Sequence, residues 1–255
     1  MIVRGRRELE ERFEELATGD VVCGPLPAGY LRGALAADLV ERGVRCVPSV
    51  LCQLLSRSKC AQALFFGRWM APHTRAVFRR TDLMEVLADC NRHGIGAVVS
   101  KQEGMHCGHG IRRWDHAEAL YNAVALTPEV FPFVVQPFLP GVGDVRVIVV
   151  GDYVEAYLRE NLYNFRSNLA AGGTGRALPM DAAAERLCRA VMARGRFPYA
   201  HIDLHLTETG ACYLSEIALD AGISAARIRR EELNWRKAEA LEIAVKEQPE
   251  MRSRA

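Results

Sequence analysis

The sequence lacks several features that would identify whole classes of protein. No apolar run is long enough to span a bilayer, and residues 1–7 lack the apolar core of a secretory signal peptide. Lysine and arginine number 33 against 31 acidic residues, so the net charge is only +2 and no basic block stands out. We therefore expect neither nucleic acid nor a membrane surface as a partner.

Paired cysteines are also absent, although the chain has eight cysteines. None of them forms a Cys-x-x-Cys pair, and their scattered spacing argues against a thiol-handling or metal-handling protein. Reduced thiols and a cytoplasmic location are the simplest interpretation. Most of these cysteines are expected to be small buried residues, with Cys107 and Cys212 the two that lie near candidate site residues.

The common glycine-rich nucleotide motifs are missing too. Neither G-x-G-x-x-G nor a P-loop occurs, even after the first predicted strand. That strand covers residues 20–24, a helix follows at 31–43, and a second strand lies at 44–47. Residues 1–55 are therefore interpreted as a short α/β scaffold and not as a nucleotide site.

The middle of the chain alternates helical and strand patterns. Helices are predicted at 56–66, which carries Lys59, at 81–93 with Thr81 as N-cap and Gly94 as stop, and from about Asp115 to residue 125. Strands are predicted at 97–101 and 133–136. Another helix begins after the N-cap Asp181.

The clearest local signal is a hairpin formed by residues 145–150 and 153–159. Gly151 and Asp152 make a two-residue turn of the right type. Pairing Val150 with Tyr153 places Arg146 opposite Tyr157 and Asp144 opposite Arg159. Asp144, Arg146 and Arg159 are then on one face of the sheet. Two arginines there indicate either a shared anionic ligand or a solvated face.

A second hairpin is predicted from residues 200–206 and 211–217. A four-residue loop would place His201 opposite Glu216 and Asp203 opposite Leu214, so that Asp203 and Glu216 are diagonal neighbours. Two carboxylates on one face repel each other unless a cation lies between them. The pair is either a magnesium site or two solvent-facing charges.

Lys101 ends its strand before a loop that contains Gly104, Gly108 and Gly110. A lysine beside such a loop is a common phosphate ligand, but a plain surface loop fits equally well. His106, Cys107 and His109 in this loop are too close in sequence to close a tetrahedral metal site easily, so they are interpreted as polar loop residues. Arg166, Ser167 and Asn168, followed by Gly172 and Gly173, form a further group of donors suited to phosphate or to an oxyanion.

The order of these motifs resembles the RimK-like ATP-grasp ligases, a group that joins glutamate or other amines to a carboxylate. The matching stretches are Val-Val-Gln-Pro-Phe-Leu at 134–139, Gly-Asp-Val-Arg at 143–146, Arg-Ser-Asn-Leu at 166–169 with Gly-Gly at 172–173, Ile-Asp-Leu at 202–204 and Leu-Ser-Glu-Ile at 214–217. The resemblance covers about residues 56–225. It implies an α+β ATP-grasp fold, in which two lobes hold ATP, preceded by the short α/β segment.

The resemblance also implies domain limits. An ATP-grasp domain is expected at 56–230, with lobe one at about 56–135 and lobe two at about 136–230. Residues 1–55 would be a shortened N-terminal segment, and the charged residues 231–255 a solvated C-terminal helix or tail.

Site roles follow from the matched positions. Lys59 and Lys101 resemble the two lysines that contact ATP phosphates, and Gln136 with the backbone of Phe138 and Leu139 resembles the adenine-binding strand. Asp144, Arg166 and Ser167 resemble further ATP contacts. Catalytic roles in steadying the transferred phosphoryl group are implied for Arg146, Arg159 and Asn168. Asp203 and Glu216 match two of three magnesium-binding positions.

The implied reaction is amide or peptide bond formation through an acyl-phosphate, with ATP and Mg²⁺ as cofactors and release of ADP and phosphate. The partners would be a small-molecule or peptide carboxylate, an amine, and possible further copies of the chain. Ala218 stands where the family has a metal-binding asparagine, and Asp220 or a water is the expected substitute. His201 and His205 are interpreted as hydrogen-bonded support for Asp203, with contact to substrate or action as a base as the alternative.

Two other functions remain open within the same fold. Ala218 is compatible with a nucleotide-binding regulatory protein that lacks full catalysis. An ATP-grasp fold is also compatible with a small-molecule kinase, which would phosphorylate a hydroxyl and not condense two substrates.

Overall fold

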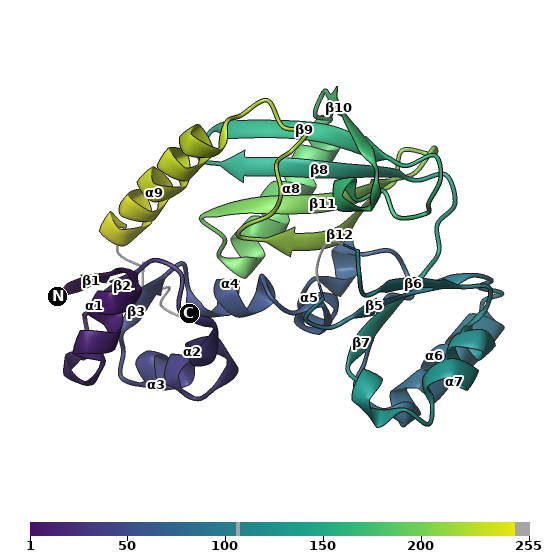
Figure 1. Ribbon diagram of the computed structural model, residues 1–255, viewed down its shortest axis with the longest axis horizontal. Helices are drawn as coiled ribbons and strands as arrows, with labels where there is room; N and C mark the ends of the chain where they lie inside the picture. The colour runs from purple at the N-terminus through teal and green to yellow at the C-terminus, as the bar shows by residue number, and fades with distance from the viewer. Residues whose placement is uncertain (106–107, 248–255) are drawn as a thin grey trace, which may run out of the picture.

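The computed structural model describes residues 1–105 and 108–247. Within these residues it has three β-sheets, and a separate hydrophobic core packs against each sheet. Figure 1 shows the five-stranded sheet above, the four-stranded sheet at lower right and the N-terminal unit at lower left. Short 3₁₀ helices join several elements: η1 Phe13–Glu15, η2 Gly67–Trp69, η3 Pro128–Val130 and η4 Leu169–Ala171.

The N-terminal unit is a parallel three-stranded sheet in the order β1-β2-β3. Its elements are β1 Ile2–Arg4, α1 Gly5–Arg12, β2 Val21–Cys23, α2 Ala28–Arg32, α3 Leu35–Glu41 and β3 Arg45–Val47. The two predicted strands are confirmed, and the helix predicted at 31–43 is confirmed for residues 35–41, but it does not begin at Leu31, which belongs to α2. The backbone is extended at Gly33, where α2 ends before α3 begins. Glycine is a poor helix former, which favours a break at this position.

The four-stranded antiparallel sheet has the order β4-β7-β5-β6. Its strands are β4 Arg75–Val77, β5 Val98–Gln102, β6 Ile111–Trp114 and β7 Phe133–Pro137, and helices α6 Arg80–Arg92 and α7 Ala117–Val124 lie together against it (Figure 1). The predicted Gly94 stop is confirmed by its φ of +61°. Thr81 is not the N-cap of α6, since that position belongs to Arg79. The helix expected to begin at about Asp115 is confirmed, with the side chain of the next residue, His116, as the N-cap of α7.

The five-stranded sheet has the order β10-β9-β8-β11-β12, and α8 Ala182–Gly195 packs against it. Its strands are β8 Gly143–Val150, β9 Tyr153–Glu160, β10 Thr174–Leu178, β11 Tyr199–Leu206 and β12 Cys212–Ala218. The register predicted for the first hairpin is confirmed, with Val150 opposite Tyr153 and Asp144 opposite Arg159. Asp181 also caps α8 as predicted, by accepting from the N–H of Ala183.

The register predicted for the second hairpin is wrong. Leu206 pairs with Cys212, and an irregularity between Asp203 and Leu204 shifts the pairing again. Asp203 therefore lies directly opposite Glu216, and His201 lies opposite Ala218. The bulge leaves Ser215 as the extra residue of β12, an arrangement that often re-aims side chains near functional sites.

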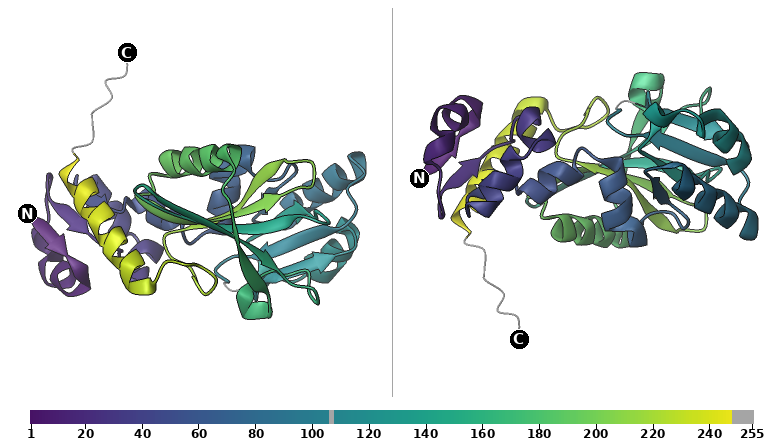
Figure 2. Two further views of the ribbon diagram at one scale, coloured as in Figure 1. Left: turned by 90° about the horizontal axis from the view of Figure 1, so that it is seen from above. Right: turned by 90° about the horizontal axis from the view of Figure 1, so that it is seen from below.

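Two helices connect the units. In α5 Lys59–Phe66, which follows α4 Val50–Leu55, the side chain of Gln62 hydrogen-bonds the backbone of Ile217 on the edge strand β12. The C-terminal helix α9 Arg230–Lys246 lies across the N-terminal unit and reaches β8 (Figure 2). Arg45 donates to the carbonyls of Ala244 and Glu247 at 3.0 and 3.1 Å, which satisfies the end of α9.

Candidate active site

Two adjoining cavities lie where the four-stranded and five-stranded sheets meet. The larger has a volume of about 530 Å³ and the smaller about 300 Å³. They share four polar residues in their walls: Arg159, Asn168, Asp203 and Glu216. Every site residue predicted from the sequence lines one or both cavities. The structure therefore brings these residues together, while their individual roles stay predictions.

Asp203 is the centre of the charged cluster. Arg146 donates to its two carboxylate oxygens at 2.7 and 2.8 Å, and Arg159 lies 2.9 Å from one of them while also pairing with Asp144. Burial alone would raise the pKa of Asp203, but the two guanidinium groups outweigh it and lower that pKa. Asp203 is thus an ionised carboxylate held between two arginines. The opposite holds at Asp144, where burial outweighs Arg159 and raises the pKa.

The two predicted phosphate lysines both approach the Glu216 end of β12. Lys101 donates to the hydroxyl of Ser215 at 3.0 Å, and Lys59 lies 3.6 Å from the Glu216 carboxylate. Both side chains are buried, and burial lowers the pKa of Lys101 against the opposing charge of Glu216. Ser215, which the sequence analysis did not single out, enters this group because the bulge turns it toward Lys101.

The donor set fits one magnesium ion better than two. Asp203 and Glu216 are cross-strand neighbours on the walls of both cavities, and Mg²⁺ is commonly held by one or two carboxylates together with substrate phosphates. Ala218 offers no ligand oxygen at the third position. The expected substitute Asp220 is engaged instead by Lys237 at 2.9 Å and Arg230 at 3.2 Å.

The glycine-containing loop meets the segment 166–168 across the smaller cavity. A Cβ atom on Gly108 would lie 2.9 Å from the side-chain oxygen of Asn168, and the φ of +81° at this position also favours glycine. Gly173 is similarly constrained, since a Cβ there would lie 2.5 Å from the carbonyl of Ser167. Arg166 donates to the carbonyl of Ile111 at 3.0 Å and so ties its segment to β6. His106 and Cys107 lie outside the described residues.

The larger cavity has an amphipathic wall at the end of β7. Gln136 is buried there, and Phe138 packs beneath the guanidinium of Arg113, whose carbon lies 4.5 Å from the ring centroid. The N–H of Phe138 donates to the carbonyl of Ala97 at 2.8 Å. This backbone donor is therefore already used, which narrows the predicted backbone contacts to the carbonyl of Phe138 and to Leu139.

The expectation that His201 forms supporting hydrogen bonds is wrong. Both of its ring nitrogens are buried, and neither has a hydrogen-bond partner among the described residues. The carboxylate of Asp220 lies 3.8 Å from its Nε2 atom. Burial, together with Lys237 and Arg146, lowers the pKa of His201 to about 3, so the ring is neutral. His205 lines the larger cavity, and burial and Lys101 lower its pKa to about 3 as well.

Comparisons with known proteins agree with this architecture. A D-alanine–D-alanine ligase from Bacillus anthracis superposes with a TM-score of 0.63 at 13% identity, covering 94% of this chain and 84% of that one. A D-cycloserine synthetase gives a TM-score of 0.62 at 16% identity, covering 89% and 84%. These likenesses confirm the predicted α+β ATP-grasp fold.

In the described residues, no helix is both long and apolar enough to cross a membrane.

The sequence comparisons point to one family. A glutathione synthetase from Parasynechococcus marenigrum is 34% identical over 177 residues, which make up 66% of this chain and 55% of the relative. The chain spans about half the length of the curated relatives it matches. A family model described as the ATP-grasp domain of prokaryotic glutathione synthetase matches residues 64–196. The chain belongs to this ATP-grasp family.

Proposed function

We propose that this chain is an ATP-dependent ligase that joins a carboxylate to an amine through an acyl-phosphate. The observation that carries the proposal is the pair of cavities that share Arg159, Asn168, Asp203 and Glu216. Such a wall allows one cavity to hold a nucleotide and the other to hold the acceptor, with the transferred phosphoryl group between them. The finer assignment to the RimK-like group is part of the same proposal.

ATP would occupy the larger cavity. Its adenine fits the wall formed by Gln136, Phe138 and Leu139, where apolar surface lies beside backbone polar groups. Lys101 reaches the same cavity and Lys59 the smaller one, so both can bind phosphate oxygens. Asp144 would contact ATP. Arg166, Ser167 and Asn168 would contact the nucleotide and its phosphates, with Asn168 in the walls of both cavities.

The chemistry requires two bond exchanges. A substrate carboxylate oxygen bonds to the γ-phosphorus of ATP, and the bond to the β–γ bridging oxygen breaks to release ADP. The amine nitrogen then attacks the acyl carbon and loses a proton, while phosphate leaves with the electron pair of its C–O bond. Arg146 and Arg159 stabilise the negative charge that develops on the transferred group. No side chain acts as a nucleophile.

Asp203 and Glu216 are the residues that would hold Mg²⁺. Bound there, the ion would supply charge neutralisation at the phosphate oxygens. The two arginines that contact Asp203 in this structure lie where they can turn toward a phosphoryl group when that carboxylate takes a metal ion. This exchange of partners keeps every buried charge paired, which a buried carboxylate requires.

The proposal is tested by ADP release from Mg-ATP with a panel of amino acids and short peptides as carboxylate and amine donors. We expect release that needs both substrates and that falls at least 100-fold in Glu216→Gln. The matched control is Glu185→Gln on the exposed face of α8, which should release ADP at the rate of the unaltered chain. A condensed product must appear by mass spectrometry.

Other results would favour the alternatives. A stable phosphorylated product formed without any amine would indicate a kinase. Tight ATP binding with no ADP release on the whole panel would favour a regulatory nucleotide-binding protein, for which Ala218 is the specific observation. The cytoplasmic location stays a prediction.

A further inference from the structure

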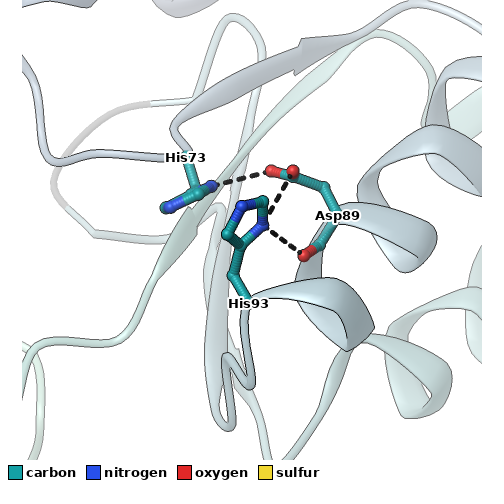
Figure 3. A group of neighbouring side chains, drawn as sticks. All are labelled: His73, Asp89 and His93. Carbon is teal, nitrogen blue, oxygen red and sulfur yellow. Dashed lines mark hydrogen bonds and ion pairs between the residues drawn. The ribbon is translucent and has the colours of Figure 1, made fainter.

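A second group of metal-ligating side chains lies away from both cavities. His73, Asp89 and His93 each offer one ligand atom, and these atoms all lie within 4.8 Å of one another. Figure 3 shows both imidazoles facing the Asp89 carboxylate. His73 Nδ1 lies 2.8 Å from Asp89 Oδ2, and His93 Nδ1 lies 3.1 Å from Asp89 Oδ1. The ring centroids are 4.5 Å apart.

The backbone at His73 is an independent sign that this side chain is needed. His73 has a φ of +64°, and the N–H of Thr74 donates to the carbonyl of Ala71 at 3.1 Å to close a turn. With Pro72 before it, His73 takes the position where such turns usually carry glycine. A histidine there costs about 1 kcal/mol of backbone strain, and strain of this kind gathers at ligand sites.

The other two residues come from one end of a single helix. Asp89 lies in the last turn of α6 and His93 is its C-cap residue, four positions later. This i,i+4 spacing places the carboxylate and the imidazole on the same face. The turn that carries His73 supplies the third group from outside the helix, so the cluster joins the residues before β4 to the end of α6.

The ligand types favour an imidazole-binding metal over a hard cation, since Zn²⁺ is bound by histidine nitrogen and carboxylate oxygen whereas Mg²⁺ and Ca²⁺ take oxygen ligands. A tetrahedral zinc ion with ligand bonds of about 2.0–2.1 Å separates its ligand atoms by about 3.3 Å. The two His–Asp89 separations of 2.8 and 3.1 Å are close to this value, and all three ligand atoms lie within 4.8 Å of one another. A metal ion would replace the proton of each His–Asp89 contact. Arg92, 3.9 Å from Asp89 Oδ1, and Arg75 add positive charge beside the site, which opposes any cation.

We propose that His73, Asp89 and His93 form a binding site for a divalent transition metal ion, with Zn²⁺ as the best fit. Two imidazoles and one carboxylate leave one coordination position for water. The His73 side chain is 31% exposed and that of His93 is 44% exposed, so the ion can enter from solvent. Its structural effect is to fasten the turn 71–74 to α6.

The site is independent of the proposed ligase reaction. The turn follows Met70, which pairs with Leu214 of β12, so metal binding would stiffen the junction between lobe-one residues and the edge of the five-stranded sheet. Asp203 and Glu216 contribute nothing to it. Failure of the ligase test leaves this inference intact, and the reverse is also true.

The test is titration of the metal-free full-length chain with Co²⁺ and Zn²⁺, followed by visible absorption, calorimetry and thermal unfolding. We expect one ion per chain with a micromolar or tighter Kd, a raised Tm, and d–d bands typical of nitrogen and oxygen ligands. A thiolate-to-Co²⁺ charge-transfer band would instead place the metal on cysteine and overturn the proposal.

Four variants locate the ion. His93→Gln should lose at least tenfold in affinity, and His73→Gly should do the same while folding normally, because glycine tolerates the φ of +64°. His116→Asn keeps an N-cap on α7 and should bind metal like the unaltered chain. Glu185→Gln, on the exposed face of α8, should also bind normally. Equal affinity in His73→Gly and the unaltered chain would overturn the assignment.

Discussion

Gln62 pairs with Ile217 as a neighbouring strand would. Its side-chain amide donates to the Ile217 carbonyl at 2.9 Å, and its side-chain oxygen accepts from the Ile217 N–H at 3.0 Å. The edge of β12 is thereby covered by a helix, which removes the unpaired backbone that an edge strand exposes. Ile217 follows Glu216, and Lys59 lies one turn before Gln62. The contact between Gln62 and Ile217 therefore also holds Lys59 close to Glu216.

We expect Gln62→Leu to destabilise the protein by about 2–4 kcal/mol, since both buried backbone groups of Ile217 lose their partners. Nucleotide affinity should fall as well, at least fivefold, because Lys59 and Glu216 are no longer held in register. Urea denaturation and calorimetry would measure the two effects. Gln53→Leu is the matched control: Gln53 makes similar buried contacts to Leu26 and Pro48 in the N-terminal unit, so stability should fall but nucleotide affinity should not.

The arginine shared by two carboxylates should dominate the stability of the site. Arg159 is 4% exposed and contacts both Asp144 and Asp203, so Arg159→Met would leave buried charge uncompensated. A loss of about 3–5 kcal/mol in unfolding free energy is expected. Arg176→Met breaks an exposed pair with Glu160 and should cost less than about 1 kcal/mol. Similar losses in both variants would contradict the role assigned to Arg159.

An oxygen ligand introduced at position 218 should strengthen the binding of Mg²⁺ with nucleotide. Ala218→Asn places an amide side chain two residue pairs from the Asp203–Glu216 pair, and so on the same face of the sheet as Glu216. We expect the Mg²⁺ concentration for half-maximal nucleotide binding to fall about tenfold, equivalent to about 1.4 kcal/mol. Ala177→Asn on the exposed strand β10 serves as the control. An unchanged Mg²⁺ dependence would mean that position 218 takes no part in the metal site.

The second glycine of the 166–173 segment should be hard to replace. Gly173→Ala would force a Cβ to within 2.5 Å of the Ser167 carbonyl, so the segment must move away from the cavities. Nucleotide affinity should fall at least tenfold. Gly29→Ala in α2 meets nothing within 4 Å and should leave binding unchanged while slightly raising stability, because alanine favours helix. Equal nucleotide affinity in the two variants would be incompatible with the proposed phosphate contact.

The stability of the region before α9 should depend on pH through Glu155. Its buried carboxylate accepts from the Tyr153 hydroxyl at 2.6 Å and from the N–H groups of Arg227 and Ile228 at 2.6 and 3.2 Å. Burial would raise the pKa of Glu155, but these hydrogen bonds outweigh it and lower the pKa below the ordinary value of 4.5.

A lowered pKa means that the unfolded chain binds the proton more readily than the folded one. The contribution of Glu155 is therefore complete above pH 4.5 and is lost as the pH falls through the folded-state pKa. We expect the unfolding free energy of Glu155→Gln to be lower than that of the unaltered chain at pH 7, with the difference shrinking on acidification. Urea denaturation at pH 7, 5 and 4 measures this, and a difference that grows toward low pH would contradict it.

Local features were predictable where the sequence carries a local cause. The turn at Gly151 and Asp152 sets the register of the first hairpin, so Asp144 and Arg159 were correctly placed opposite each other. Asp181 as an N-cap and Gly94 as a helix stop depend on neighbouring residues alone. Strands β1, β4, β6 and β10 were missed, because short strands with exposed charged residues form only when a distant strand pairs with them. The domain limits remain predictions.

The charged C-terminal segment is a second case in which local sequence did not predict the contacts of a helix. It was expected to be a solvated helix or tail, yet Leu233 and Lys237 of α9 are buried. Lys237 donates to Asp220 and to the carbonyl of Leu219, contacts that depend on residues 17 and 18 positions earlier in the chain. The same contact holds Asp220 in an ion pair with Lys237.

The sequence by itself determined the first hairpin, because its register depends on a local turn, and it determined the order of the motifs on which the resemblance to ATP-grasp ligases rests. Tertiary structure alone decided which of them touch. The bulge at Ser215 set Asp203 directly opposite Glu216 and turned Ser215 toward Lys101. Tertiary packing also placed the turn at His73 next to Asp89 and His93. These contacts depend on long-range packing, which changes register and closes distances that no local pattern records.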